Sequence, residues 1–182
     1  MSNEKQLNVQ PVSVAGLFDD KQKATQFVEK LINEDFPMDQ LSLLHKGGGH
    51  GDDPLGVVYT NDKERIKVWG EQGVLWGALG GLLAGLSGVF LVPGFGSILA
   101  AGPVVEALLG AITGGTAMAG AAAVTSITTA FRRLQIPEES LKELETAIQN
   151  GQYLLLLHSD ATHSERLAQR LGYEGAQSVF QF

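Results

Sequence analysis

The chain has 182 residues, no cysteine and a formal net charge of −7. The lack of cysteine excludes disulfides and thiolate metal sites. The acidic balance argues against a nucleic-acid partner, because such a partner needs a basic face that neutralises phosphates. Residues 1–10 are polar, lack the apolar core of a secretory signal and are predicted to be disordered.

Charge is distributed unevenly along the chain. From Gly73 to Phe131 the only formal charge is Glu106. The chain therefore divides into two polar flanks, residues 11–60 and 136–182, and an apolar insert over residues 61–135. We expect the two flanks to form one domain and the insert to form a separate helical unit.

The first flank has the pattern strand, helix, strand. Alternation in "PVSVAGLF" predicts a strand over residues 11–18, and "LSLLHK" predicts a second strand over residues 41–46. Between them, residues 19–36 favour a helix with Asp19 as its N-cap. One apolar stripe follows this helix, at Ala24, Phe27, Val28, Leu31 and Ile32.

The second flank repeats this pattern. It predicts a helix over residues 137–151, a strand over 153–159, a helix over 162–172 and a strand over 177–182. Thr162 and Glu165 have the spacing of a capping box at the start of the second helix. Leucines on both faces of strand 153–159 indicate a central strand that is covered on both sides.

Together the flanks predict an α+β fold, namely a ferredoxin-like βαβ–(insert)–αβαβ domain that the insert splits. In this prediction strands 11–18 and 153–159 are central and parallel. A ferredoxin-like sheet has helices on one face only, so the leucines of strand 153–159 need further cover. A second subunit, helix 138–150 or the insert could supply it, and we expect self-association or docking.

The opening of the first flank resembles bacterial general-stress proteins of the YflT-like type. In that family a strand ends in a small-apolar-Phe/Tyr-Asp pattern before an Ala-bearing helix. The matching positions here are Ala15, Gly16, Leu17, Phe18, Asp19 and Ala24. Many such proteins have a Gly/Ala-rich middle with the pattern "PGxGPxxAAGP", and "VPGFGSILAAGPV" (92–104) is similar. The resemblance implies a stress-associated bacterial protein and supplies no catalytic residues.

Small residues recur every four positions in the insert. The first column is Gly73, Gly77, Gly81 and Gly85, and the second is Ala107, Ala111, Gly115, Ala119 and Ala123. In a helix this spacing places each column on one face, where another helix can approach closely. We therefore predict a glycine-zipper hairpin of two helices, over residues 73–92 and 103–131, joined by a turn at "PGFGS".

The first of these helices is long enough to span a bilayer, which needs about 20 apolar residues. Basic residues flank both predicted helices, at Arg65 and Lys67 and at Arg132 and Arg133. They place both ends of the hairpin on the cytoplasmic side. We expect insertion in the bacterial inner membrane with the polar domain in the cytoplasm. Two alternatives stay open: a hairpin that lies in one leaflet, and a soluble, cytoplasmic oligomer that buries its hairpins.

Few residues have a pattern typical of a reactive site. Glu106 is either an ionisable membrane site or an acid that the dipole of a helix beginning at Pro103 stabilises, and we expect the second. The glycine-rich stretch lacks the lysine of a phosphate loop. The histidines, His45, His50, His158 and His163, match no recognised metal-ligand spacing. We predict no catalytic residue, no cofactor and no metal.

The sequence thus favours a non-enzymatic, stress-associated protein that self-assembles through a glycine-zipper hairpin in or against a membrane. Such an assembly would scaffold, stabilise or remodel the membrane. One alternative is a small pore lined by the threonines Thr113, Thr116, Thr125 and Thr128. The other is a closed, soluble homo-multimer or cage with the hairpins inside.

Overall fold

The computed structural model describes residues 12–47, 87–92, 94–110, 122–123 and 127–182. The strands are β1 (Val12–Phe18), β2 (Leu41–Lys46), β3 (Ser87–Val92), β4 (Gly96–Ala101), β5 (Ala122–Ala123), β6 (Tyr153–His158) and β7 (Ser178–Gln181). The helices are α1 (Lys21–Asn33), α3 (Pro103–Gly110), α4 (Ile127–Arg133), α5 (Glu138–Gln149) and α6 (Ala161–Tyr173), and a short 3-10 helix covers Met38–Gln40. The predicted α+β class is confirmed.

The strands form one sheet in the order β5-β3-β4-β2-β6-β1-β7. Every neighbouring pair is antiparallel except β3 with β5. The predicted parallel pairing of strands 11–18 and 153–159 is therefore wrong, because β1 and β6 run antiparallel with Ala15 opposite Leu156. The crossover through α1 returns the chain to a strand parallel to β1 but two positions away, and β6 fills the gap in the opposite direction.

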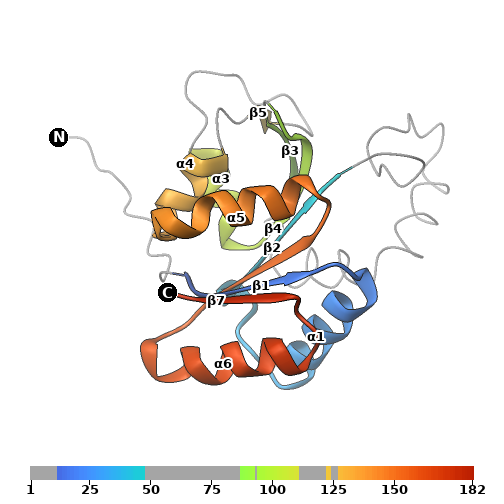
Figure 1. The fold of residues 1–182 in the computed structure, drawn as a ribbon, viewed down its shortest axis with the longest axis vertical. Helices are drawn as coiled ribbons and strands as arrows, with labels where there is room; N and C mark the ends of the chain where they lie inside the picture. The colour runs from blue at the N-terminus through green and yellow to red at the C-terminus, as the bar shows by residue number, and fades with distance from the viewer. Residues whose placement is uncertain (1–11, 48–86, 93, 111–121, 124–126) are drawn as a thin grey trace.

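Helices cover both faces of this sheet (Figure 1). On one side, called the α5 face, lie α3, α4 and α5, and on the other, called the α1 face, lie α1 and α6. Two ion pairs join the helices of the α1 face, Lys30–Glu174 and Arg170–Glu34, each at 2.5 Å.

Strand β6 contributes to both cores. Leu154 and Leu156 pack in the core of the α5 face, and Leu155 and Leu157 pack in the core of the α1 face. All four side chains are 0 % exposed. The cover that the sequence requires thus comes from α5 and from α3 and α4 of the insert, within the same chain, and needs no second subunit.

Helix α1 buries the predicted apolar stripe, since Ala24, Phe27, Val28 and Leu31 are all buried. Its N-cap is Asp20 instead of Asp19, and the Asp20 carboxylate accepts a hydrogen bond from the backbone N–H of Gln22. Both aspartates are good caps, so the sequence pattern alone leaves an uncertainty of one residue.

The described part of the insert differs from the predicted helical hairpin. Residues 87–92 form β3 and residues 96–101 form β4, and these two strands make an antiparallel hairpin next to β2. Gly94 and Gly96 have φ of 83° and 84° in the turn, a conformation that glycine adopts without strain. The turn itself was predicted at this place, but extended chain flanks it because β2 offers a free edge that a strand can pair with.

The second predicted helix, over residues 103–131, is also not continuous. Helix α3 ends at Gly110, residues 122–123 pair with β3 as the short strand β5, and α4 begins at Ile127. Among the described residues, none of the helices has both the length and the apolar character that crossing a bilayer requires. Residues 1–10, which were predicted to be disordered, lie outside the described residues.

The two-sided burial of β6 yields a prediction. We expect Leu156→Ala and Leu155→Ala each to lower the free energy of unfolding by about 2–5 kcal/mol, because each leaves a cavity in a different core. Denaturant titration followed by circular dichroism measures this, with the 89 % exposed Tyr173 replaced by alanine as the control.

Because the chain itself covers both faces, the loss for Leu156→Ala should not depend on protein concentration. A loss that appears only at concentrations where the protein associates would mean that a second subunit covers the α5 face.

Candidate functional site

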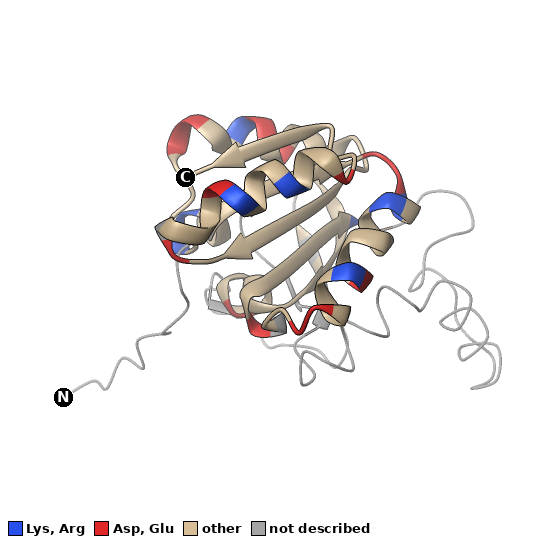
Figure 2. Cartoon of the chain, turned by 90° about the horizontal axis from the view of Figure 1, so that it is seen from below, with Lys and Arg blue, Asp and Glu red and all other residues tan. Residues whose placement is uncertain are grey.

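The apolar insert forms one end of the sheet, and we call this part the uncharged end. It consists of β3, β4, β5 and α3 and carries a single formal charge, Glu106. Charged residues gather instead on the helices of the two flanks, as Figure 2 shows from the side of the α1 face. Formal charge is therefore unevenly distributed along the sheet, because the helices of the flanks carry most of it and the described residues of the uncharged end carry one charge.

A close backbone contact joins the uncharged end to the centre of the sheet. Gly102 connects β4 to α3 with φ of 87°, and a Cβ atom at this position would lie 2.1 Å from the carbonyl oxygen of Leu41. Only glycine combines this conformation with this approach. The chain can therefore turn from β4 directly into α3 while α3 stays against β2.

We call the turn at Gly102, together with its contact to Leu41, the joint. Two buried polar side chains hold the start of α3 there. The Oγ of Ser42, in β2, accepts a hydrogen bond from the backbone N–H of Val104 at 3.0 Å. The same Oγ lies 3.3 Å from Nε2 of His158 in β6. Ser42 is 0 % and His158 1 % exposed. Since Ser42 accepts from Val104, its hydroxyl hydrogen is free to donate to His158, and every group in this chain of contacts is satisfied.

The predicted helix-packing residues fall into three groups. Gly73, Gly77, Gly81, Gly85, Ala111, Gly115 and Ala119 lie outside the described residues. Ala107 lies in α3 and is buried in the α5-face core of its own chain. Ala123 lies in strand β5, so the prediction that Ala107 and Ala123 share one helix face is wrong. A spacing of four residues shows which residues would share a face if the helix continued, but it does not show where the helix ends, and α3 ends at Gly110.

Glu106 lies in the first turn of α3, which begins at Pro103. Its side chain is partly exposed. This is the position that the simpler of the two interpretations predicted, because a helix dipole favours an acid in its first turn.

The pore hypothesis placed four threonines along a permeation path. Thr113, Thr116 and Thr125 lie outside the described residues. Thr128 lies in α4, where its hydroxyl donates a hydrogen bond to the carboxylate of Glu145 in α5. This hydrogen bond joins two helices of the same domain, and the pore hypothesis stays a prediction.

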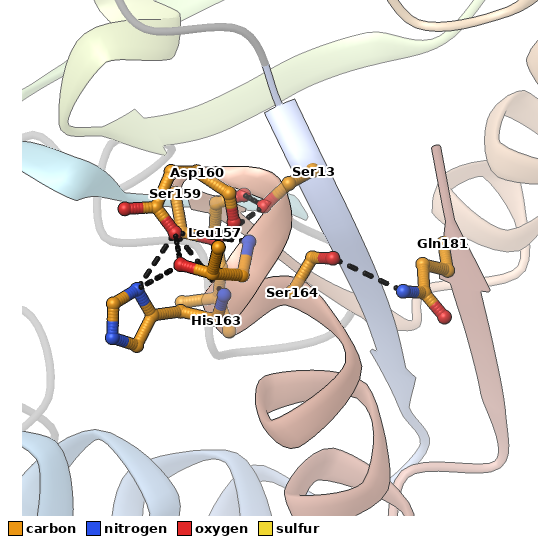
Figure 3. A network of polar contacts seen from close by, with 8 residues as sticks. Ser13, Leu157, Ser159, Asp160, His163, Ser164 and Gln181 are labelled. Carbon is orange, nitrogen blue, oxygen red and sulfur yellow. Dashed lines mark hydrogen bonds and ion pairs between the residues drawn. The ribbon is translucent and has the colours of Figure 1, made fainter.

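Polar side chains also meet where β6 leads into α6 (Figure 3). The Asp160 carboxylate caps α6 and accepts from the backbone N–H groups of Thr162 and His163. It also contacts the Thr162 hydroxyl at 2.6 Å and Nδ1 of His163 at 2.7 Å. The cap is therefore Asp160, not the predicted pair of Thr162 with Glu165, because the carboxylate alone accepts from the N–H groups of the second and third helical residues.

These contacts lower the pKa of Asp160 to about 2, with the hydrogen bond from Thr162 as the largest cause and that from His163 as the next. On the neighbouring strand, Ser13 donates to the carbonyl oxygen of Leu157 and contacts the Ser159 hydroxyl at 2.8 Å (Figure 3). This network fixes the junction between β6 and α6. The Asp160 carboxylate is bound to the free N–H groups at the N-terminus of α6.

The structure separates the histidines. His158 is buried on the α5 face, His163 is exposed on α6, and His50 lies outside the described residues. Across the described part of the chain, no group of three or more His, Cys, Asp or Glu side chains has a geometry that could hold a metal ion.

His45 is part of the packing of β2. Its ring stacks on that of Tyr153, with centroids 3.9 Å apart and an angle of 4° between the planes. Burial is the main cause that lowers the pKa of His45, and Nδ1 is buried without a hydrogen-bond partner among the described residues. The ring is therefore neutral at physiological pH and acts as an aromatic core residue.

An open groove of about 440 Å³ runs between α5 and the start of β7. Leu17 and Ala147 line it on the apolar side, and Lys142, Glu143 and Gln152 line it on the polar side. Its charged groups come from one solvent-exposed face of α5, and they do not converge on a common point in the way that catalysis requires.

A comparison with known protein families, with curated proteins and with solved structures found no match in any of the three. The resemblance to general-stress proteins thus stays a prediction that rests on the residues quoted for it.

Sequence reasoning missed the joint around Gly102. "AAGPV" carries the signal for a turn into a helix, since glycine precedes a proline at a first helical position. Ser42 and His158 gave no local signal, because each is a single polar residue in an apolar strand and their contact joins positions 116 residues apart.

The joint makes a prediction with a matched control. Gly102→Ala and Gly151→Ala both place a side chain at positive φ, which costs about 1–2 kcal/mol. Only Gly102 would also place a Cβ against a carbonyl oxygen, since Gly151 has nothing within 4 Å. We expect the larger loss of stability in Gly102→Ala, as measured by thermal unfolding. Equal losses would show that the close approach to Leu41 is unimportant.

The cap makes a second prediction. The pKa of Asp160 is depressed, so its stabilisation is fully present above the ordinary value of 3.8 and is lost as the pH falls through about 2. We expect Asp160→Asn to destabilise the protein near neutral pH, and this difference from wild type to shrink towards pH 2. Urea titrations across this range test it, with Glu165→Gln on the same helix as the control. A difference that is independent of pH would contradict the role of the charge.

Proposed function

We propose that this chain is a non-enzymatic, stress-associated bacterial protein that self-assembles through its glycine-zipper segment in or against a membrane. In this role it scaffolds, stabilises or remodels the membrane. The observation that supports the proposal is the uncharged end, where β3, β4, β5 and α3 present one formal charge between them. Among the side chains that the structure describes at this end, Leu109 is the large apolar one that is exposed, and exposed apolar groups beside an uncharged segment are typical of membrane or protein contacts.

The charged part of the molecule is the outer layer in this proposal. We assign β7, β1, β6 and β2, with α1 and α6, to a ferredoxin-like unit to which the insert is attached at the β2 edge. Their antiparallel order and their two strand–helix–strand connections support this assignment. The same arrangement keeps the charged helices in water, on the cytoplasmic side of the membrane.

The side of the membrane is proposed from the basic residues near the insert. Arg132 forms an ion pair with Glu138, with Nε 2.6 Å from Oε1, and both groups are exposed. This ion pair neutralises the charge of Arg132 in part. Arg133 therefore contributes more of the positive charge that would keep this end of the insert on the cytoplasmic side. Arg65 and Lys67, which belong to the other end, lie outside the described residues.

The exposed Leu109 supports an apolar contact at the uncharged end. It lies near the end of α3, immediately before the Gly/Ala-rich residues 111–121, and is 45 % exposed. A leucine at the point where the chain enters such a segment adds apolar area that a membrane or a second copy can bury.

The glycine column provides the test of self-assembly. We expect Gly77→Leu and Gly81→Leu to dissociate the oligomer, because leucine side chains prevent close approach of two backbones. Ala78→Leu is the matched control, since it introduces the same side chain into the same segment away from the glycine column. Sedimentation velocity, with and without detergent, measures the oligomer. If the glycine variants sediment like the wild type, the zipper is not the contact.

The same preparations distinguish the membrane from a soluble assembly. The proposal requires the wild-type protein to float with phospholipid vesicles in a density gradient. Release by an alkaline carbonate wash would argue against a spanning segment but not against a peripheral one. A defined oligomer that neither floats with vesicles nor depends on detergent would replace the proposal with a closed, soluble multimer.

A further inference from the structure

Strand β7 lies at one end of the sheet, and the uncharged end lies at the other (Figure 1). It pairs with β1 on one side, and among the described residues no strand pairs with its other side. Residues 175–182 contain no charged side chain and no proline. Natural sheets commonly protect a free edge with such residues, because the unpaired backbone groups of an edge strand can bind another strand. β7 therefore has the properties of a strand that pairs with a partner.

The hydrogen bonds to β1 show which backbone groups of β7 face outward. The N–H of Phe182 donates to the carbonyl oxygen of Ser13, which continues the register of the two strands. Hydrogen-bonded and non-hydrogen-bonded pairs alternate along antiparallel strands, so the backbone of Phe180 also faces β1. The N–H and C=O groups of Val179 and Gln181 lie at the alternate positions and point away from β1.

Two phenylalanines lie along this edge on the α5 face. The rings of Phe180 and Phe182 stack with their centroids 6.4 Å apart and pack against the α5-face core. Both side chains are only partly buried. Helix α5 packs mainly on β6 and β2, further towards the centre of the sheet. The two rings therefore keep apolar surface that a partner can bury.

The groove of about 440 Å³ lies on the same face, at the start of β7. Leu17 and Ala147 line its apolar side, and Ser178 lines it from β7. Ser178 is opposite Leu17 in the pairing of β7 with β1, so both side chains are on the α5 face. Because serine is small, the border of the groove at the free edge stays open.

We propose that β7 pairs antiparallel with β7 of a second copy of the chain, about a two-fold axis that passes beside Phe180. In this register Val179 is opposite Gln181 of the second copy, and symmetry forms the same pair again. All the outward N–H and C=O groups of these two residues are then hydrogen-bonded. Among the registers of β7 against itself, this one satisfies the largest number of these groups.

The same register brings the phenylalanines of the two copies together. Phe180 is opposite Phe180 of the second copy in a non-hydrogen-bonded pair, where the side chains are closest. Ser178 is opposite Phe182 of the second copy, so this ring lies at the open border of the groove and covers its apolar side. Each copy thus provides the ring that the groove of the other copy accepts.

Symmetry and charge favour a second copy over another extended partner. Homodimers commonly use the same surface on both subunits, and an antiparallel pair of identical strands is a contact of this kind. The chain has a net charge of −7, so two copies repel each other where acidic surfaces meet. The uncharged residues 175–182 let two copies approach without this repulsion.

This contact does not rest on the proposed contact through the glycine column, because it uses the opposite end of the sheet. The two contacts are compatible in one assembly. If both form, each chain has two partners at two different surfaces, and assembly continues beyond the dimer.

A single introduced cysteine tests the register, because the chain has none of its own. In Phe180→Cys the two cysteines are directly opposite, with Cα atoms about 4.5 Å apart, which is within the range of a disulfide. Tyr173→Cys is the control for random collisions, since Tyr173 is 89 % exposed on α6. We expect Phe180→Cys to form disulfide dimers faster than this control under mild oxidation, as measured by non-reducing electrophoresis. Equal or slower formation would overturn the proposed pairing.

The edge can also be tested with every aromatic ring in place. Ser178→Lys places a charge where Phe182 of the second copy lies, and Gln177→Lys adds the same charge at an exposed residue just outside β7. We expect Ser178→Lys to raise the dissociation constant of the dimer about tenfold, and Gln177→Lys to leave it unchanged. Sedimentation equilibrium measures the constant, and circular dichroism checks that both variants are folded. Equal constants for Ser178→Lys and the wild type would contradict the proposal.

Gly81→Leu separates this contact from the proposed function. With the glycine contact removed, we expect a dimer of twice the chain mass of 19.3 kDa, and a monomer once Ser178→Lys is added. A monomer for Gly81→Leu alone would overturn the β7 contact and leave the glycine contact standing. A wild-type oligomer that Gly81→Leu leaves intact and Ser178→Lys dissociates would overturn the glycine contact and support the pairing of β7.

Discussion

The burial of β6 on both faces determines how the other strands and the helices are arranged around it. Four consecutive leucines, 154–157, place two large apolar side chains in each core. A strand of this kind is stable only at the centre of a sheet with a layer on either side. Helices α1 and α6, which both belong to the flanks, form the layer on one face. The second layer needs α5 together with α3 and α4, so the insert is part of the domain's own packing and not an appendage.

The joint at Gly102 shows how the insert takes this role. Glycine at positive φ turns the chain from β4 into α3, and Ser42 holds the first turn of α3 on β2. The contact to His158 extends this connection to the central strand. Buried polar groups of this kind are costly when unpaired, so the three groups favour one docking position of α3 over its neighbours. The apolar end of the molecule is thereby fixed relative to its charged end.

The elements of the flanks were predictable from sequence because their periodicity is local: the stripe of α1 and the alternation of β1 need only a few neighbouring residues. The antiparallel pairing of β1 with β6 was not predictable in this way, because it depends on which strand enters a gap in the sheet. In residues 87–101 almost every side chain is apolar or small, so neither a helical nor a strand period stands out. The free edge of β2 decides the outcome there. At the candidate site, the place of Glu106 followed from its spacing to Pro103, whereas Ser42 and His158 depend on tertiary contacts.

The register of β1 with β6 has a consequence for the order of events during synthesis. Ala15 pairs with Leu156, so the first strand waits for a partner that is translated near the end of the chain. The whole apolar insert is translated before that partner exists. Until then β1 and β2 have no strand between them, and the second layer has no sheet to cover. The nascent chain therefore carries its most apolar residues before β6 is available to pack with them, and this interval is when a chaperone or a membrane surface can first capture them.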